Sequence, residues 1–449
     1  MNAHFNSQLL CALALCTLAG PVLAIGSQAL DRQLDTVTRQ VEQRADRAIE
    51  RALDRRLESV EQRIEARADQ AIERLPELPP SVSINTQKGR TAFNDVLMDT
   101  GYRAVERQWL ATGTASEMAE LERPGITILA QRELSGLGIL LVRFRVAPAL
   151  DSLSALQTAL PGLAEQLDRN HIYAPQNEQS AAAPQQREVT RPQWQSLCHT
   201  PLRIGMIDTA IALEHPVFEG TRVVQENFLQ LTDIGDSLTA PTGHGTAVAS
   251  LMVGHQADQW PARLPGATLF NASVFYGSDR DLSGATLGHL LEGFNWLAEQ
   301  KVSVINISLT GPDNRLLRTA VDRLNQQGIA MVAAVGNGGP AAPPLFPAAY
   351  PEVIGVTAVN ASGELYRWAN RGEQVLFSAL GVDVPVAQPG GGLTTDSGTS
   401  LAAPVVSSAL ACRLDSQTVT EAIASLAADA KGLGEPGRNA RFGHGLLDY

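Results

Sequence analysis

The sequence predicts an α/β fold for the second half of the chain, with a mostly parallel sheet between two layers of helices. Apolar runs of strand length alternate there with helix-like segments, and the runs are continuously hydrophobic. Continuous hydrophobicity is typical of strands buried on both faces, as in a parallel sheet covered by helices. With 449 residues and 44% hydrophobic content, the chain is long enough for two or three domains.

The first 24 residues have the pattern of an export signal. Leu9–Leu18 is apolar but too short to span a bilayer, and Val22-Leu23-Ala24 resembles a small-residue cleavage site. We therefore expect residues 1–24 to be a signal peptide and the product to be periplasmic or extracellular, without an integral membrane segment. No Lys or Arg precedes the apolar run, so a buried N-terminal helix or an uncleaved anchor is left open.

Residues 25–76 are expected to form a long, charged, amphipathic helix. Neither glycine nor proline occurs between Ala29 and Leu75, where acidic residues and arginines interleave. Apolar residues recur about every 3.75 residues, which is longer than the 3.5 of a left-handed coiled coil. We expect residues 26–75 to pack on a partner, a second copy or the rest of the chain. A solvated single helix held by i,i+4 ion pairs is the alternative.

Residues 77–100 are expected to be a linker, because three prolines stop the helix and a polar stretch follows. Residues 101–174 then show the order βαββαβ, which is the ferredoxin-like order. Residues 175–195 are rich in Gln, Ala and Pro, which indicates an exposed linker open to proteolysis. The expected strands of the βαββαβ region are 105–111, 126–130, 139–146 and 163–173, and its expected helices are 116–121 and 153–160.

Residues 196–449 form the predicted α/β domain. In such a sheet, functional residues lie on loops at the carboxyl ends of strands, and Asp208 and Asn337 both follow apolar runs. The expected strands are 204–207, 269–275, 302–307, 329–335 and 353–359, and the expected helices are 246–254, 286–300, 316–327 and 401–410.

Three short motifs in this domain carry chemistry. They are Ile-Asp-Thr-Ala at 207–210, Gly-His-Gly-Thr at 243–246 and Gly-Thr-Ser-Leu-Ala-Ala-Pro at 398–404. A serine hydroxyl is a poor nucleophile unless an imidazole takes its proton and a carboxylate orients that imidazole. Each motif alone is more often a helix cap or a loop. Structural roles of this kind, however, give no reason for all three motifs to occur together. We therefore predict a triad of Asp208, His244 and Ser400.

The order Asp, His, Ser along the chain is that of subtilisin, and residues 200–449 resemble the subtilisin-like serine peptidases, the subtilase family. The resemblance implies a subtilisin-like three-layer fold with a mostly parallel sheet, preceded by a small ferredoxin-like α+β prodomain and the long N-terminal helix. Besides the three motifs, it is carried by Val-Ile-Asn-Ile-Ser-Leu at 304–309, Ala-Ala-Val-Gly-Asn-Gly at 333–338 and Phe-Pro-Ala-Ala-Tyr-Pro at 346–351.

The resemblance also implies roles for individual residues. Asn337 matches the family's oxyanion-hole asparagine, which acts with the Ser400 backbone N–H. Thr310 stands where relatives usually have glycine, so we predict a preference for small or medium residues before the scissile bond. His215, in a family turn, is interpreted as structural. The residues implied to bind substrate, as strand edges that hold an extended peptide, are Ser308, Leu309, Thr310, Ala334, Val335 and Gly336.

The position of residues 101–174 resembles that of subtilase propeptides, which assist folding and inhibit the enzyme through their C-terminal tail. The resemblance thus makes the chain's own propeptide an intramolecular inhibitor. We expect self-cleavage within residues 174–190, near Ala181–Ala183. A small accessory domain that stays attached is the competing interpretation.

Cysteine usage fits an exported product. Cys11 and Cys16 would leave with the signal peptide, so Cys198 and Cys412 would remain as an even pair in an oxidising compartment. A bond between them would tie the entrance of the α/β domain to the helix opened by Ser400. Two buried thiols are the alternative.

These observations predict an exported serine endopeptidase that cleaves protein or peptide substrates through a Ser400 acyl-enzyme. The alternatives are a secreted binding or assembly protein that uses its N-terminal helix and keeps a latent peptidase domain, or an acyl-enzyme esterase or ligase. We expect no cofactor and no catalytic metal, and structural calcium is left open because no Asp-rich loop identifies a site. The net charge of −12 argues against a nucleic-acid partner.

Overall fold

The computed structural model describes residues 80–175, 194–256, 260–278 and 282–449. All of them belong to one compact unit, Leu78–Tyr449. The expected signal peptide, the helix at 25–76 and most of the linker at 175–195 lie outside the described residues. Within the described part, no helix combines the length and the apolar character needed to cross a membrane.

A parallel sheet of eight strands forms the centre of the unit, in the order β21-β18-β17-β16-β14-β7-β11-β8. The five predicted apolar runs all lie in it. Every residue of β16 and β17 is buried, as continuous hydrophobicity predicts. The strands are β7 (Arg203–Asp208), β8 (Arg222–Asn227), β11 (Thr268–Ser273), β14 (Val304–Ile307), β16 (Ala330–Ala334), β17 (Val353–Val359), β18 (Val375–Leu380) and β21 (Leu446–Leu447).

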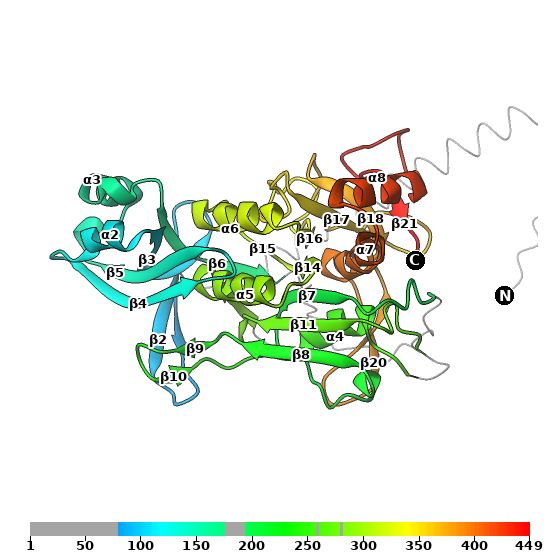
Figure 1. Cartoon of the computed structure of the whole chain (residues 1–449), viewed down its shortest axis with the longest axis horizontal. Coiled ribbons are helices and arrows are strands. Elements are labelled where there is room, and N and C mark those ends of the chain that lie inside the picture. Colours follow the sequence, from blue (N-terminus) through cyan, green and yellow to red (C-terminus); the bar gives the residue numbers. More distant parts are fainter. Residues whose placement is uncertain (1–79, 176–193, 257–259, 279–281) are drawn as a thin grey trace, which may run out of the picture. The chain divides into compact units, whose positions relative to one another are not determined.

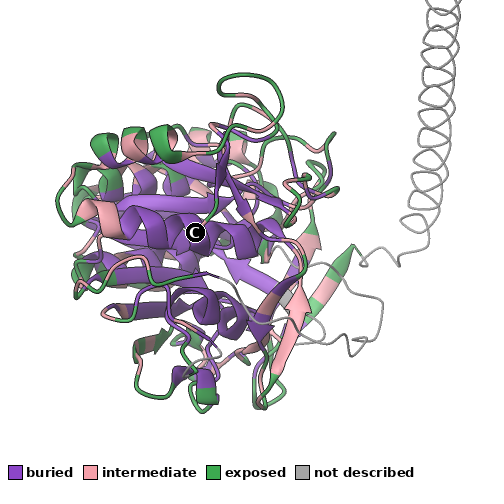
Figure 2. Cartoon of the chain, turned by 90° about the vertical axis from the view of Figure 1, so that its right-hand side faces the viewer, coloured by how far each residue is buried: buried purple, intermediate pink, exposed green. Residues whose placement is uncertain are grey.

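Helices cover both faces of this sheet, which gives the predicted three layers (Figure 1). Successive residues of β7 face opposite clusters: Met206 packs with α4, α7 and α8, whereas Ile207 packs with α5 and α6. Figure 2 shows the inner strands of this sheet and the inner helices as buried and the outer loops as largely exposed. The helices are α4 (Gly243–Met252), α5 (Leu287–Glu299), α6 (Arg315–Gln326), α7 (Thr399–Leu414) and α8 (Val419–Asp429).

Four antiparallel strands, which we call the smaller sheet, precede the central sheet in the chain and belong to a nine-stranded sheet. Their elements follow the order β-α-β-β-α-β (Figure 1). The four strands lie in the spatial order β4-β5-β3-β6, which is the ferredoxin-like arrangement. The elements are β3 (Arg103–Gly113), α2 (Ala115–Met118), η1 (Ala119–Leu121), β4 (Ile126–Leu134), β5 (Ile139–Val146), η2 (Pro148–Leu150), α3 (Leu153–Ala159), η3 (Pro161–Leu163) and β6 (Leu167–Pro175).

The expectation of a linker at residues 77–100 is wrong. Strands β1 (Ser81–Asn85) and β2 (Thr91–Leu97) form an antiparallel hairpin, and β2 pairs with β3. Ile84 and Phe93 lie opposite each other and are buried with Leu231 of the following domain. The hairpin forms because apolar residues alternate with polar ones on either side of a turn at Gly89, whose φ of 77° suits glycine.

Several short strands extend the smaller sheet or form separate two-stranded pairs. β12 (Tyr276–Gly277) and β13 (Leu282–Thr286) extend the smaller sheet beyond β6, and β15 (Leu309–Thr310) also pairs with β6. The remaining elements are the pair β9 (Gln230–Leu231) and β10 (Asp236–Ser237), the pair β19 (Val384–Ala387) and β20 (Leu393–Asp396), and the turn η4 (Pro216–Phe218).

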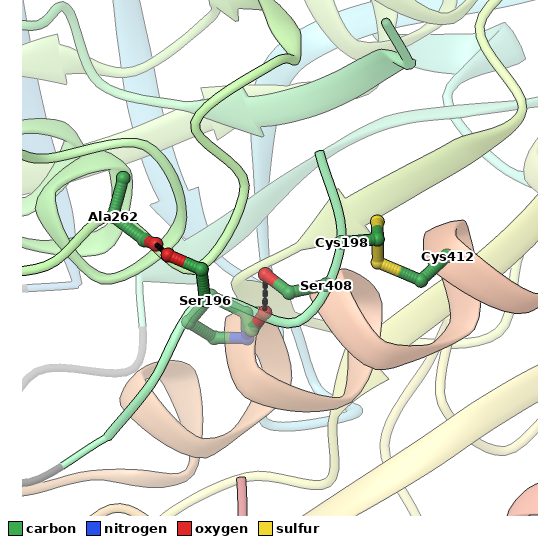
Figure 3. The surroundings of a disulfide bond; sticks show 6 residues. Ser196, Cys198, Ala262, Ser408 and Cys412 are labelled. Carbon is green, nitrogen blue, oxygen red and sulfur yellow. Dashed lines mark hydrogen bonds between the residues drawn. A yellow bond between two sulfur atoms is a disulfide. The ribbon is translucent and has the colours of Figure 1, made fainter. Parts of the chain in front are cut away.

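Cys198 and Cys412 form a disulfide bond, with 5.9 Å between their Cα atoms (Figure 3). The bond joins the segment that precedes β7 to the last turns of α7. Beside it, the Ser196 hydroxyl donates to the Ala262 carbonyl at 2.7 Å. Of the two alternatives left open by the sequence, the structure therefore contains the pairing.

Candidate active site

Asp208 is the last residue of β7 and is fully buried at the carboxyl edge of the central sheet. Its Oδ1 atom accepts the Nδ1–H of His244 at 2.7 Å and the backbone N–H of Thr209 at 2.7 Å. The apolar run before Asp208 forms the strand, and the strand fixes where the carboxylate lies. This contact holds the imidazole with Nδ1 as donor, which leaves Nε2 as the atom able to take a proton.

His244 is the second residue of α4, and the glycine after it lets the helix begin beside β7. A Cβ atom on Gly245 would lie 2.5 Å from the Thr209 carbonyl oxygen. The Gly245 N–H instead donates to the Thr209 hydroxyl at 2.7 Å, and the Thr246 hydroxyl accepts the N–H of Ala212 at 2.9 Å. The Gly-His-Gly-Thr motif therefore brings α4 to the end of β7.

The electrostatic surroundings of His244 favour its protonated form. Burial lowers the pKa of His244, but the charge and hydrogen bond of Asp208, with a further contribution from the charge of Asp396, raise it. The resulting pKa lies above the ordinary value of 6.5. His244 Nε2 is buried and has no hydrogen-bond partner among the described residues.

Ser400 is the second residue of α7, and α7 packs against α4. Its backbone carbonyl accepts a hydrogen bond from the Ser308 hydroxyl at 3.3 Å. The helices that carry His244 and Ser400 thus pack against each other. Ser400 also lies beside Ser308, the residue before β15. Ser400 is 2% exposed.

Asn337 lies close to the same helix start. Its Oδ1 atom accepts the N–H and the hydroxyl of Thr399, at 3.1 and 2.9 Å. Gly336, with φ of 111°, donates its N–H to the Thr399 hydroxyl at 3.3 Å. Because Oδ1 accepts from Thr399, the donor group of this side chain is its Nδ2 amide.

The end of β6 lies between two strand edges of the α/β domain. Tyr173 pairs with Ala285 of β13, and Ala174 pairs with Thr310 of β15. The Tyr173 ring is fully buried, and its hydroxyl donates to the Pro312 carbonyl at 3.1 Å. This is how an extended peptide binds to exposed strand edges.

The six residues expected to bind substrate divide into two groups. Leu309 and Thr310 pair with β6, and Ser308 contacts Ser400, so these three lie along the strand that enters the site. Val335 instead donates its backbone N–H to Val356 at 3.1 Å, and its side chain belongs to the core. Ala334 is the last residue of β16, and Gly336 holds Thr399.

Sequence reasoning missed two parts of this site. β13 was not predicted as a strand, although it forms the second edge that holds β6. Asp396 was not singled out, although its charge reaches His244. The signal available for Asp396 was its position four residues before Ser400, next to the serine motif.

His215 lies outside this group and makes structural contacts. Its Nδ1 accepts the Val217 N–H at 3.0 Å, and its Nε2 lies 2.9 Å from the Gly392 carbonyl. These bonds join the η4 turn to the β19–β20 hairpin loop, in keeping with a structural interpretation. Among the described residues, no group of three His, Cys, Asp or Glu side chains is suited to hold a metal ion.

Comparison with known proteins identifies the family. Residues 201–445 match the model of the family described as the subtilase family. The chain is 32% identical over 212 residues to the minor extracellular protease Epr of Bacillus subtilis (strain 168), a match that covers 46% of this chain and 32% of Epr. It is 30% identical over 261 residues to subtilisin DY of Bacillus licheniformis, covering 55% of this chain and 89% of that protein.

A solved structure, that of the self-cleaved protease domain of PatA, is 26% identical, with a TM-score of 0.46 and coverage of 55% of this chain and 92% of that chain. Because the family model matches more than half of the sequence, the chain belongs to the subtilase family of subtilisin-like serine peptidases.

Proposed function

We propose that the chain is an exported serine endopeptidase that hydrolyses peptide bonds through an acyl-enzyme on Ser400. The observation that carries the proposal is the 2.7 Å contact between Asp208 and His244, made beside the helix that Ser400 opens. In this arrangement the base, His244, has a fixed tautomer, and the hydroxyl of Ser400 lies on the adjoining helix α7. Export to the periplasm or the extracellular space is inferred from residues 1–24.

In the proposed reaction, Ser400 Oγ attacks the carbonyl carbon of the substrate while His244 Nε2 takes the hydroxyl proton. Asp208 keeps the imidazole oriented and stabilises its positive charge. The negative oxygen that forms accepts hydrogen bonds from Asn337 Nδ2 and the Ser400 backbone N–H. His244 then gives its proton to the leaving amine. Water attacks the acyl-enzyme by the same route and frees Ser400.

We further propose that residues 101–174 are an inhibitory propeptide. The support is the position of β6, whose last residues occupy the edges of β13 and β15, where an extended substrate would lie. The pairing extends to Pro175 with Leu309. Leu309 adjoins Ser308, whose hydroxyl contacts the Ser400 carbonyl. We therefore expect cleavage at the beginning of the 174–190 window and not at Ala181–Ala183.

The direct test compares wild-type protein with the Ser400→Ala variant. We expect a fluorophosphonate to label wild type alone, peptide hydrolysis to be lost in the variant, and mass spectrometry to find a processed species in wild type alone. N-terminal sequencing of that species gives the cleavage site. Processing of purified Ser400→Ala would rule out self-cleavage, and labelling of the variant would rule out Ser400 as the nucleophile.

A further inference from the structure

A cavity of about 200 Å³ opens beside His244. Thr209, Gly243 and His244 line one side of it, and Gln388, Thr394 and Asp396 of the β19–β20 hairpin and its loop line the other. None of the described lining residues belongs to β13 or β15, the strands that hold β6. The cavity is therefore separate from the groove occupied by the end of β6.

The direction of β6 indicates what the cavity is for. An extended peptide that follows β6 approaches Ser400 from its N-terminal side, between β13 and β15. The part of a substrate beyond the cleaved bond must then continue past His244, which donates a proton to the leaving nitrogen in the proposed mechanism. The cavity shares His244 with the reacting groups, so it lies where the leaving half of the peptide binds.

Asp396 sets the charge of this cavity. Among the described residues, it is the one acidic side chain in the lining, and neither Lys nor Arg lines the cavity. Asp396 is the partly buried last residue of β20, and its Oδ1 accepts the Ser397 N–H at 2.8 Å, which fixes the carboxylate. In the described part of the chain, the other titratable group that lines the cavity is His244, which must be neutral for Ser400 to attack.

We propose that Asp396 makes this enzyme select a Lys or Arg side chain within the first two residues after the scissile bond. A partly buried carboxylate is stabilised by an opposite charge, and charge-assisted hydrogen bonds are about twice as strong as neutral ones. An acidic residue at the same place meets a like charge and is disfavoured. This inference rests on the proposed peptidase function and adds the substrate class that the leaving-group side accepts.

The test uses matured full-length enzyme and quenched peptides that differ only at the first or the second position after the cleaved bond. These positions carry Arg, Lys, norleucine or Glu. We expect kcat/KM for Arg or Lys to exceed that for norleucine by about tenfold at one of the two positions, with Glu below norleucine. Asp396→Asn should reduce the Arg-to-norleucine ratio to about one, and Asp396→Lys should make Glu the preferred residue.

Asp383→Asn is the matched control, because Asp383 is exposed and precedes β19 in the same hairpin, at a φ of 54° that asparagine tolerates. This variant should keep the wild-type ratios. Asp396→Asn should also move the acid limb of the pH profile of kcat/KM to lower pH, because the Asp396 charge helps to raise the pKa of His244. A purely structural role of Asp396 would not produce this shift.

Fluorophosphonate labelling separates the two claims. If wild type fails to label, the proposed function falls. If wild type labels and hydrolyses peptides but shows no basic preference, or if Asp396→Asn and Asp396→Lys label and keep the wild-type preference, the role of Asp396 is overturned.

Discussion

At the residue scale, the contact between Asp208 and His244 depends on residues that have no chemical role. A Cβ atom at position 245 would lie 2.5 Å from the Thr209 carbonyl oxygen, so Gly245 is what allows α4 to begin this close to β7. The Thr209 and Thr246 hydroxyls then complete the backbone hydrogen bonds at the junction. In a motif such as Gly-His-Gly-Thr, one residue therefore reacts and its neighbours position it.

The pH dependence of activity follows from the surroundings of His244. The base acts in its neutral form, so kcat/KM should rise as the pH passes the pKa of His244 in the free enzyme. That pKa is raised above 6.5, because the Asp208 and Asp396 charges outweigh burial. We therefore expect the half-maximal rate above pH 6.5, measured on matured enzyme at constant ionic strength. A midpoint near pH 5 would contradict this account of the base.

Asn337 gives a second prediction at this scale. Asn337→Ala removes an oxyanion donor, and we expect kcat to fall about 100- to 1000-fold with little change in KM. Asn337→Asp is the matched variant, because its carboxylate still accepts from Thr399 but offers no N–H. Both variants should be similarly slow. Near-normal activity of Asn337→Asp would show that the side chain serves only to anchor Thr399.

At the element scale, the sequence predicted five strands of the central sheet and missed β8, β18 and β21, together with several elements that local pairing defines. β7, β11, β14, β16 and β17 are apolar runs, and the structure has all of them. The β1–β2 hairpin was missed because its polar outward residues resemble a linker, and β13 was missed because it is an edge too short for a pattern. The edge at β15 was expected only through the family resemblance. α8 was missed although Thr418 and Glu421 form a capping box at its start.

The pairing of β6 with β15 leads to a prediction about autoinhibition. A Cβ atom on Gly311 would lie 2.4 Å from the Tyr173 ring, so Gly311→Ala should push Tyr173 from its site and weaken the hold on β6. We expect a shorter lag before peptide hydrolysis begins. Gly432→Ala is the control, because no atom lies within 4 Å of its added Cβ. In a Tyr173→Ala background, which already weakens the hold on β6, Gly311→Ala should shorten the lag no further. An unchanged lag in Gly311→Ala would show that Tyr173 does not limit release.

The disulfide links elements 214 residues apart in sequence. A long closed loop restricts the unfolded chain, and removing a native disulfide typically costs about 2–5 kcal/mol of unfolding free energy. We expect the unfolding free energy of Cys198→Ser/Cys412→Ser to fall by that amount, which lowers the urea concentration at the midpoint of unfolding. Reductant should destabilise the wild type and leave the double variant unchanged. Equal sensitivity of both proteins to reductant would exclude the bond as the cause.

At the scale of the whole molecule, the small sheet packs on α5 and α6 of the α/β domain, and two further contacts join them. One is β6 in its groove. The other is the β1–β2 hairpin, where Arg90 pairs with Asp236 at 3.1 Å and Ile84 and Phe93 pack on Leu231. Between them, His289 of α5 is buried beneath β4 and β5 in a small cavity. Sequence alone could not show this, because His289 has no partner at a recognisable spacing.

His289 should make this contact sensitive to acid. Burial, and then the charges of Arg143 and Arg132, lower the pKa of His289 to about 3. Glu292 also lines the cavity, and Asp233 pairs with Arg143. Once exposed, His289 regains an ordinary pKa near 6.5. Above pH 6.5, His289 is therefore neutral in both states and does not lower the free energy of unfolding. As the pH falls from 6.5 toward 3, the free energy of unfolding decreases by up to about 1.4 kcal/mol per pH unit.

The measurement is urea unfolding at pH 7 and pH 5 in the Ser400→Ala background, which prevents self-digestion. His289→Gln keeps a neutral side chain of similar size that takes no proton. We expect the variant to lose about 2 kcal/mol less than its parent between the two pH values. His215→Gln is the matched control, since His215 lies on the η4 turn away from the small sheet. Because other carboxylates and histidines titrate equally in parent and variant, only the difference between them reports on His289. An identical loss of unfolding free energy in both proteins would contradict this account. His289 would then be exposed in the folded protein or would take up its proton without unfolding.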